Sequence, residues 1–250
     1  DNADEDQDGL ADACDECPFD SDNDIDEDGL CCGDLVESIY ELNFDGINDY
    51  VSLPAIAPEI ASVGGLSTLS FDYKGTEAIF AIEPTSNPWP QLYRVIIDES
   101  INGISTIKTY HRNYDNSVSY EPETGYISND NIWNNIVISI DNANGSYRLY
   151  HNGEKVIDYE FTPSVFYNEN VVWNIGRLPY GDNSFFNGSL KNITLWNYSF
   201  NDDDVSSFLN GDIAPSQSNT YANFGFSGND AELHDFSGNG NHGTILGAEW

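Results

Sequence analysis

Residues 132–156 read IWNNIVISIDNANGSYRLYHNGEKV, and this stretch decides the fold. Its runs NIVISID (135–141) and SYRLYHNG (146–153) are rich in Ile, Val and Tyr, which is typical of β-strands. Turn residues separate them in DNANG (141–145), and HNG (151–153) carries the Asn-Gly pair favoured in tight hairpins. The stretch therefore predicts neighbouring antiparallel strands joined by short turns.

The same texture continues from Val36 to the C-terminus, as short apolar or alternating runs broken by Gly, Asn, Asp and Pro. Further strands are predicted at 50–54, 69–74, 78–82, 92–97, 104–111, 155–161, 171–176 and 189–197. Short strands with closely spaced turns are typical of an all-β sandwich or barrel. One helix is predicted in NDDDVSSFLNG (201–211), with Asn201 or Asp202 as its cap, acidic residues in its first turn and Gly211 at its end.

Residues 1–34 have a different composition, with regularly spaced aspartates and almost no hydrophobic residues. From Asp4, the string DEDQDGLADACD places carboxylates at loop positions 1, 3, 5, 9 and 12, with Gly9 at position 6. Calcium takes six to eight oxygen ligands, and the glycine permits the turn that brings a backbone carbonyl onto the ion. An EF-hand also needs flanking helices, and only three residues precede Asp4 in this sequence, so an EF-hand is not expected.

A second aspartate ladder runs from Asp20 to Asp28 and is followed by Gly29. Cys32 stands where its ninth position needs an oxygen ligand, unless nearby Asp34 supplies one. The calcium ligands predicted for the two ladders are Asp4, Asp6, Asp8, Leu10, Asp12, Asp15, Asp20, Asp22, Asp24, Asp26, Asp28, Leu30 and Asp34. The alternative is a solvated acidic linker, against which the repeated spacing argues.

All four cysteines, Cys14, Cys17, Cys31 and Cys32, lie in this segment. A segment that cannot bury a core relies on disulfides or metal for order, and four cysteines allow three pairings. Zinc is the rival interpretation, but a second C-x-x-C is missing and no His is nearby. The strings DEDQDGLAD, CDECP and DIDEDG resemble thrombospondin type 3 repeats, which implies a calcium-bound, disulfide-tied stalk that spaces domains.

The charge balance of the chain limits its partners. Eight Lys+Arg stand against 43 Asp+Glu, a formal net charge of −35. This charge repels nucleic acid phosphates and anionic membranes, and it fits a protein that holds divalent cations or stays soluble at high salt. No apolar run approaches the ~18 residues that span a bilayer, so no membrane insertion is expected. The cysteines indicate an extracellular or cell-surface protein, whose export signal is expected outside these residues.

Four blocks of the chain resemble, in one order, the laminin G-like, concanavalin A-like domains of secreted bacterial proteins. The blocks are LNFDGINDYVSLP (42–54), the stretch at 132–156, FFNGSLKNITLWNYSFNDDDVSSFLNG (185–211) and DFSGNGNHGTILGAEW (235–250). The resemblance implies an all-β fold, a jelly-roll sandwich of two antiparallel sheets with one concave face. The expected organisation is a calcium-binding stalk at 1–34 followed by the sandwich domain at 35–250.

The resemblance also implies a calcium site in the sandwich, because domains of this kind often bind one. The matching oxygen-rich positions are Asp45, Asp49, Asp235 and Asn239. The alternative is that FDGIND and SGNGN are tight turns in which Asp and Asn side chains cap the backbone. The sequence leaves both interpretations open.

Catalytic strings are missing from the sequence. The implied fold also hosts glycosidases, which place two carboxylates on one strand face. Neither the E-x-D-x-x-E string of its retaining glycosidases nor the G-x-S-x-G of Ser-His-Asp hydrolases occurs, and the His residues are scattered. We therefore expect a non-catalytic protein, with a polysaccharide-degrading glycosidase or lyase as the alternative.

Aromatic side chains are the first candidates for ligand contact, because exposed rings stack on sugars. Trp133, Trp173 and Trp196 lie within strand patterns and are predicted to pack in the core, whereas Trp89 lies between two prolines and is predicted on a loop. Arginines near tyrosines complete the predicted ligand-binding set, which is Trp89, Tyr110, Arg112, Tyr114, Arg177 and Tyr180.

These observations predict a calcium-binding adhesion or carbohydrate-binding module within a larger multidomain protein. Its partner would be a polysaccharide or a glycoconjugate, such as a cell-surface glycan. A domain that only spaces its neighbours and takes no ligand is a third hypothesis.

Overall fold

The computed structural model describes residues 41–53, 67–84, 93–100, 104–112, 119–120, 132–162, 171–177, 185–224 and 231–250. The chain divides into two units, Asp1–Ile39 and Tyr40–Trp250, and every described residue lies in the second. The predicted boundary between residues 34 and 35, the four cysteines and the calcium ligands from Asp4 to Asp34 lie outside the described residues and stay predictions.

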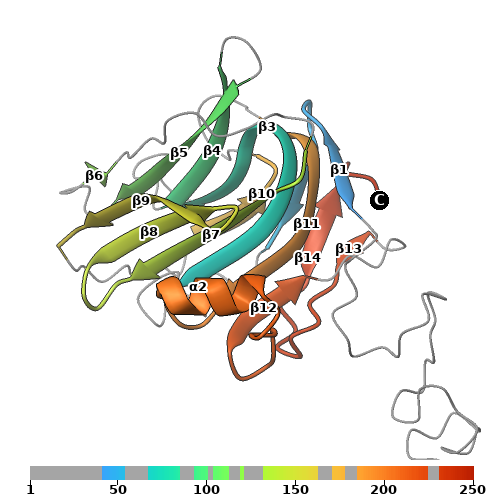
Figure 1. The fold of residues 1–250 in the computed structure, drawn as a ribbon. Coiled ribbons are helices and arrows are strands. Elements are labelled where there is room, and N and C mark those ends of the chain that lie inside the picture. The colour runs from blue at the N-terminus through green and yellow to red at the C-terminus, as the bar shows by residue number, and fades with distance from the viewer. Residues whose placement is uncertain are drawn as a thin grey trace, which may run out of the picture. The chain divides into compact units, whose positions relative to one another are not determined.

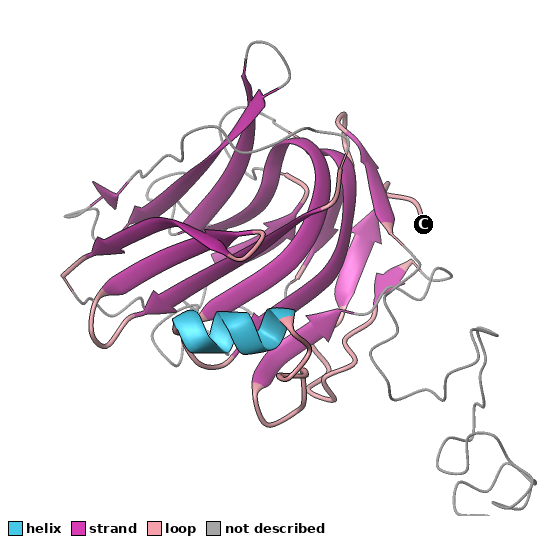
Figure 2. Ribbon diagram, viewed as in Figure 1, coloured by secondary structure: helices cyan, strands magenta, loops and turns pink. Residues whose placement is uncertain are grey.

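Two antiparallel sheets form a sandwich, and one long strand belongs to both (Figure 1). The first, which we call the helix-side sheet, has the order β12 (Thr220–Phe224), β11 (Asn187–Trp196), β3 (Thr68–Pro84), β7 (Asn134–Asp141), β8 (Ser146–His151) and β9 (Glu154–Glu160), and β1 (Leu42–Asp45) also pairs with β11. The second, the opposite sheet, has the order β13 (Glu232–Leu233), β14 (Gly243–Leu246), β2 (Tyr50–Ser52), β10 (Val171–Ile175), β3, β4 (Tyr93–Ser100), β5 (Ile104–Arg112) and β6 (Ser119–Tyr120). Figure 2 shows strands making up most of the described structure, so the predicted all-β jelly-roll sandwich is confirmed.

The long strand β3 passes from one sheet to the other. Its first part pairs with β7 and β11, and its second part pairs with β10 and β4. Gly75 of β3 lies directly opposite Gly188 of β11, and a Cβ on either glycine would overlap the backbone of the other strand. The prediction of two separate strands at 69–74 and 78–82 is wrong, because this glycine permits a close backbone approach instead of ending the strand.

The core lies between the two sheets and follows the alternation of side chains along each strand. Ile136, Ile138 and Ile140 of β7 are buried in it, and Trp173 of β10 contributes from the opposite sheet. The intervening residues of β7, such as Ser139, therefore face the outer side of the helix-side sheet.

The helix α2 (Asp202–Leu209) lies on that outer side (Figure 1). Its predicted cap is confirmed, because Asn201 Oδ1 accepts hydrogen bonds from the backbone N–H groups of Asp203 and Asp204, and Asp204 Oδ2 accepts one from the Asn201 N–H. Beneath the helix lies a second hydrophobic cluster formed by Val137, Tyr150, Trp196, Phe200 and Val205.

Buried hydrogen bonds hold the segment before α2 against the sheet. Ser139 Oγ donates to the carbonyl oxygen of Phe200 at 2.7 Å, and Trp196 Nε1 donates to Ser70 Oγ at 3.0 Å. These contacts fix the start of α2 relative to the strands beneath it.

Both turns predicted within residues 132–156 are confirmed. β7 and β8 are joined by a turn at 142–145, and β8 and β9 are joined by Asn152 and Gly153. Asn152 has φ 48° and Gly153 has φ 81°, which is the conformation that a two-residue hairpin turn of this kind requires. None of the described helices is long and apolar enough to cross a membrane.

Candidate functional site

A pocket of about 410 Å³ opens beside the first turn of α2, on the outer side of the helix-side sheet. We call it the α2 pocket. Charged and amide side chains line it, and they are Arg148, Lys155, Asp158, Asn201, Asp202 and Asp203. They come from β8, β9 and the start of α2.

Strand alternation places the basic part of the α2 pocket. Tyr147 and Leu149 are buried in the core, so Arg148 between them faces the outer side of the sheet. Asp158 of β9 lies directly opposite Arg148 in the strand register. The acidic part follows from the helix, because the capping residue and first turn of α2 carry polar and acidic side chains that favour a helix N-terminus.

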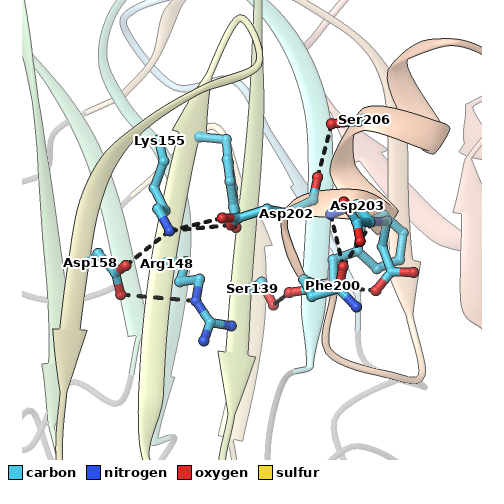
Figure 3. Close-up of polar contacts among 11 residues, drawn as sticks. Ser139, Arg148, Lys155, Asp158, Phe200, Asp202, Asp203 and Ser206 are labelled. Atoms are coloured by element: carbon cyan, nitrogen blue, oxygen red, sulfur yellow. Dashed lines mark hydrogen bonds and ion pairs between the residues drawn. The ribbon is translucent and has the colours of Figure 1, made fainter.

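Lys155 joins the two parts of the pocket. Its Nζ lies 3.0 Å from Asp158 Oδ2 and 3.1 Å from Asp202 Oδ2, and Figure 3 shows it between the two carboxylates. The hydroxyl of Tyr150 also donates a hydrogen bond to Asp202. This bond, and then the bond from Lys155, lowers the pKa of Asp202 below its ordinary value. The carboxylate of Asp202 is therefore ionised and held in place at neutral pH.

The guanidinium of Arg148 interacts more weakly with the pocket carboxylates than the ammonium of Lys155 does. Its Nε lies 3.9 Å from Asp158 Oδ1, which is an ion-pair distance and too long for a hydrogen bond. Within the described part of the chain, this guanidinium donates no hydrogen bond to the protein. Since the side chain is 29% exposed, its planar set of N–H donors is available to a ligand.

None of the α2 pocket residues belongs to the predicted ligand-binding set. They come from two stretches, 148–158 and 201–203, which only the packing of α2 on the sheet brings together. One feature of the sequence could have pointed to the pocket. Arg148 and Lys155 are two of only eight basic residues in the chain, and they lie seven positions apart.

The predicted ligand-binding residues that can be placed belong to the opposite sheet. Arg177 follows β10, and its guanidinium carbon lies 3.6 Å from the ring centroid of Tyr50. Tyr110 and Arg112 are positions of β5. Trp89, Tyr114 and Tyr180 lie outside the described residues.

The register of the opposite sheet brings some of these positions together. Asn174 of β10 pairs with Ala81, Ala81 pairs with Arg94, and Arg94 pairs with Tyr110. This register places Tyr110 three strands from Asn174 across the opposite sheet. The Asn174 side chain is buried, and neither end of its amide has a hydrogen-bond partner among the described residues.

The prediction that three tryptophans pack in the core is confirmed for Trp173 and Trp196 and wrong for Trp133. Trp173 is 1% exposed and Trp196 is fully buried. Trp133 is half-buried just before β7 and lies outside both hydrophobic clusters. The Nζ atoms of Lys74 and Lys191 each lie 4.8 Å from its ring centroid.

The four predicted calcium positions in the sandwich form two separate pairs. Asp45 and Asp49 are joined by a 2.8 Å hydrogen bond from the Asp45 N–H to Asp49 Oδ2, and Asp49 lies against Gly247, just after β14. Asp235 and Asn239 belong to a turn that precedes β14. Calcium at either pair stays a prediction.

Asp235 has the geometry of a turn-capping residue. Its Oδ1 accepts backbone N–H bonds from Asn223 and Ser237, both at 2.9 Å, and its Oδ2 accepts one from Asn241 at 2.8 Å. Burial acts to raise the pKa of Asp235, but these bonds outweigh it and the pKa is lowered. The same turn is tied to β12 by Asn239, whose Nδ2 donates to the carbonyl of Thr220 at 2.9 Å.

The pKa of Asp49 is shifted in the opposite direction to that of Asp235. Its side chain is buried, and burial together with the charges of Asp45 and Glu249 raises its pKa, although the bond from the Asp45 N–H acts in the other direction. Glu249, which the sequence did not single out, lies near because its backbone forms a bridge with Asn43 beside β1. A carboxyl in this setting resists ionisation unless a cation offsets the repulsion.

A third group with metal-ligand chemistry joins Glu232, His234 and His242, whose ligand atoms lie within 4.8 Å of one another. His242 Nδ1 accepts a hydrogen bond from the Asp235 N–H at 3.1 Å. In the neutral ring the proton then lies on Nε2, so neither nitrogen of His242 is free to bind a metal. The group therefore does not offer three free ligands.

Asp202 lacks the electrostatics of a glycosidase general acid. A general acid on a glycosidase needs a carboxyl whose pKa is raised, so that it still holds its proton near neutral pH. In the pocket, the pKa of Asp202 is shifted in the opposite direction. The arrangement suits hydrogen bonding to a ligand better than proton transfer to a leaving group.

Comparison with known protein families gives one match, over residues 74–206, to the family described as "Concanavalin A-like lectin/glucanases superfamily". No curated protein matches the chain. Among solved structures, one described as "a putative carbohydrate binding protein from Bacteroides ovatus ATCC 8483" is 16% identical, with 83% of this chain and 58% of that chain covered and a TM-score of 0.56.

Two further structures are more distant in shape. The CBM40 of the Ruminococcus gnavus IT-sialidase is 18% identical, with 68% of this chain and 98% of that chain covered and a TM-score of 0.49. A heptameric SAP-like pentraxin from Limulus polyphemus is 14% identical, with 67% and 80% covered and a TM-score of 0.48. At such identities the likeness concerns the fold, whereas the family match spans more than half of the sequence. The chain belongs to the concanavalin A-like lectin/glucanase superfamily.

Proposed function

We propose that this protein is a non-catalytic carbohydrate-binding module and that the α2 pocket holds the sugar. The observation that carries the proposal is the guanidinium of Arg148, which has no hydrogen bond to a described residue and stands among carboxylates held in place. A sugar hydroxyl both donates and accepts hydrogen bonds, so it can accept from Arg148 and donate to Asp203 or Asp158 in the same pocket.

Pocket size and rigidity support this assignment. A volume of about 410 Å³ lies within the range of small-ligand sites. Asp202 is held by Tyr150 and Lys155, and Asn201 is held by the capping box of α2. A ligand therefore meets side chains that are already in position, which reduces the entropy lost on binding.

Charge favours a neutral sugar over an acidic one. The α2 pocket is lined by two basic and three acidic side chains, and the whole chain carries a formal charge of −35. A uronate or sulfate group entering the pocket would lie near Asp158, Asp202 and Asp203 and would be repelled. Neutral hydroxyls do not incur this cost.

The family is consistent with the proposal and does not decide it. The superfamily description includes both lectins and glucanases. Two observations favour binding over catalysis: no E-x-D-x-x-E string occurs in the sequence, and the pKa of Asp202 is lowered. The Bacteroides ovatus structure shares the fold at a TM-score of 0.56, and its description as a carbohydrate binding protein agrees with this choice.

Two matched variants of the 250-residue chain test the proposal. Arg148→Met keeps the aliphatic stem and removes the free donors, whereas Arg177→Met makes the same change on the opposite sheet beside Tyr50. Hydrogen bonds to a charged group contribute about 1.5–3 kcal/mol, so we expect Arg148→Met to weaken binding roughly tenfold or more, and Arg177→Met to leave it unchanged. Isothermal titration calorimetry against a panel of neutral oligosaccharides measures both.

Each alternative outcome has a distinct meaning. If Arg177→Met abolishes binding and Arg148→Met does not, the sugar lies on the opposite sheet, as the sequence predicted. If no neutral or acidic glycan binds the unmodified protein, the proposed function is wrong. Release of reducing ends or of unsaturated products from a polysaccharide would contradict the non-catalytic assignment.

We further propose that residues 1–34 form a calcium-binding stalk of an extracellular or cell-surface adhesion protein. The support is the sequence itself, with its two aspartate ladders and interleaved cysteines. Calcium that binds the folded stalk stabilises it by linkage, so EDTA should increase proteolysis of this segment in the full chain, and added calcium should reverse the effect. Unchanged proteolysis after EDTA would contradict the proposal.

A further inference from the structure

Trp133 lies in a polar setting that differs from that of the core tryptophans. It precedes β7, and β7 pairs with β3 so that Asn134 lies opposite Tyr73 and Asn135 lies opposite Asp72. Tyr73 is buried in the core, so Lys74 beside it belongs to the outer side of the helix-side sheet. The indole therefore lies on the same side of the sheet as the α2 pocket.

Two of the eight basic residues of the chain converge on this ring. The Nζ atoms of Lys74 and Lys191 each lie 4.8 Å from its centroid, within the range of cation–π attraction. Lys74 also forms an ion pair with Glu41 at 3.4 Å. Such contacts hold the ring in one orientation on the surface.

Lys191 lies directly opposite Asp72 in the strand register, yet the two do not form an ion pair. The Asp72 carboxylate is occupied instead by two amides, since Asn135 Nδ2 and Asn192 Nδ2 each donate to it at 2.7 Å. Within the described part of the chain, the ammonium of Lys191 forms no hydrogen bond and no ion pair, and it lies 4.8 Å from the indole centroid. The protein has 43 acidic residues, yet the Lys191 ammonium has no carboxylate partner among the described residues. Its N–H donors are therefore available to a ligand.

An irregularity of β11 places Lys191. The register of β11 against β3 shifts between Lys191 and Thr194, and Asn192 within this bulge has φ 54°, which is uncommon for a residue other than glycine. Bulges redirect side chains and recur next to functional sites, and positive φ at such residues marks strain that the surroundings maintain. Here the bulge lets Asn192 reach Asp72 and leaves Lys191 beside the ring.

We propose that Trp133, with Lys191, is a second sugar-binding contact for a neutral polysaccharide, in which the indole stacks on a sugar ring and the ammonium donates to a hydroxyl. This inference rests on the proposed function, because it takes the same class of ligand. Among the described residues, the charged groups around the ring are Lys74, Lys191, Glu41 and Asp72, and their charges sum to zero. These described groups therefore offer no net attraction for an acidic polymer.

The spacing of the two sites fits a chain ligand and not a single sugar. Trp133 lies just before β7, and Ser139 of β7, which lies opposite Arg148, is six residues further along the chain. At ~3.3 Å per residue of extended chain, Trp133 and Ser139 are separated by roughly 20 Å along the strand direction, and Arg148 lies on the next strand across the sheet. A polysaccharide that lies across the outer side of the helix-side sheet can reach both, which raises its affinity through the second, linked contact.

The test compares long and short ligands on the full chain. Trp133→Ala should weaken binding of a neutral polysaccharide that the unmodified protein binds by about threefold to tenfold, the usual range for a lost aromatic contact. Binding of the matching monosaccharide or disaccharide, which occupies only the α2 pocket, should stay unchanged. Trp133→Phe should retain most of the affinity, and Lys191→Met should weaken it while leaving thermal unfolding unchanged.

The outcomes separate the inference from the function on which it rests. If Trp133→Ala and Lys191→Met bind the polysaccharide as tightly as the unmodified protein, the second contact is wrong and the α2 pocket stands. If Trp133→Ala lowers the melting temperature and Lys191→Met has no effect on affinity, the ring is structural. Tighter binding of uronate-bearing or sulfated polymers than of neutral ones would overturn the ligand class, and no binding at all would overturn the proposed function.

Discussion

At the scale of single residues, environment and not residue type decides what each carboxylate does. Asp235 accepts three backbone N–H bonds and has a lowered pKa, so it acts as the structural centre of its turn. Asp49 is buried beside other carboxylates and has a raised pKa, because burial and the neighbouring negative charges disfavour its ionised form. The sequence suggested the same role for both, because neither burial nor the number of N–H donors can be read from residue spacing.

His151 gives a prediction at this scale. Burial lowers its pKa to about 4, since a proton on the ring would have to lie in a half-buried site between β7 and β9. The unfolded chain takes up that proton near pH 6.5, so the stability that neutral His151 contributes is complete above that pH and is lost as the pH falls towards 4. The loss should be on the order of 1–3 kcal/mol.

Urea unfolding at a series of pH values measures this effect. His151→Gln should remove the part of the pH dependence between 6.5 and 4, because glutamine does not titrate while it still reaches Asn134, the present partner of the ring. A histidine resonance of residue 151 that titrates near pH 6.5 in the folded protein would show the prediction to be wrong.

At the scale of elements, the sequence was most reliable where local chemistry decides the outcome. The hairpin turn at Asn152 and Gly153 follows from positive φ values that these residues adopt easily, and the start of α2 follows from the Asn201 cap. It was least reliable for β3, whose length depends on how closely Gly75 approaches another strand. The α2 pocket was missed for a similar reason, because its two stretches meet only after the helix packs over Trp196 and Phe200.

The cap of α2 gives a prediction at this scale. Asn201→Ala removes the side-chain acceptor of two backbone N–H groups and should destabilise the protein by about 1 kcal/mol. It should also weaken sugar binding, because the same cap positions Asp202 and Asp203 in the α2 pocket. Asn201→Asp, which keeps an acceptor, should retain both properties, and denaturant unfolding with calorimetry measures them.

A control lies at the other end of the same helix. Asn210 caps the C-terminal turn through its backbone N–H and not its side chain, so Asn210→Ala should change stability by no more than about 0.5 kcal/mol. If Asn201→Ala and Asn210→Ala have equal effects, the capping box does not organise the pocket.

At the scale of the whole molecule, the scarcity of positive charge makes its placement informative. Of the eight basic residues, Lys74, Arg148, Lys155 and Lys191 belong to strands of the helix-side sheet. Arg148 and Lys191 are the two of this group that have no hydrogen bond to a carboxylate among the described residues. Both adjoin surfaces on the outer side of that sheet, one the α2 pocket and the other the half-buried ring of Trp133, which is why we propose the glycan there.

The most direct test is a crystal structure of the full chain soaked with a neutral oligosaccharide that calorimetry shows to bind. We predict a sugar unit in the α2 pocket, with a hydroxyl oxygen within hydrogen-bond distance of the Arg148 guanidinium and another hydroxyl donating to Asp158 or Asp203. A sugar bound instead over Tyr50 and Arg177 on the opposite sheet, with the α2 pocket empty, would contradict the account.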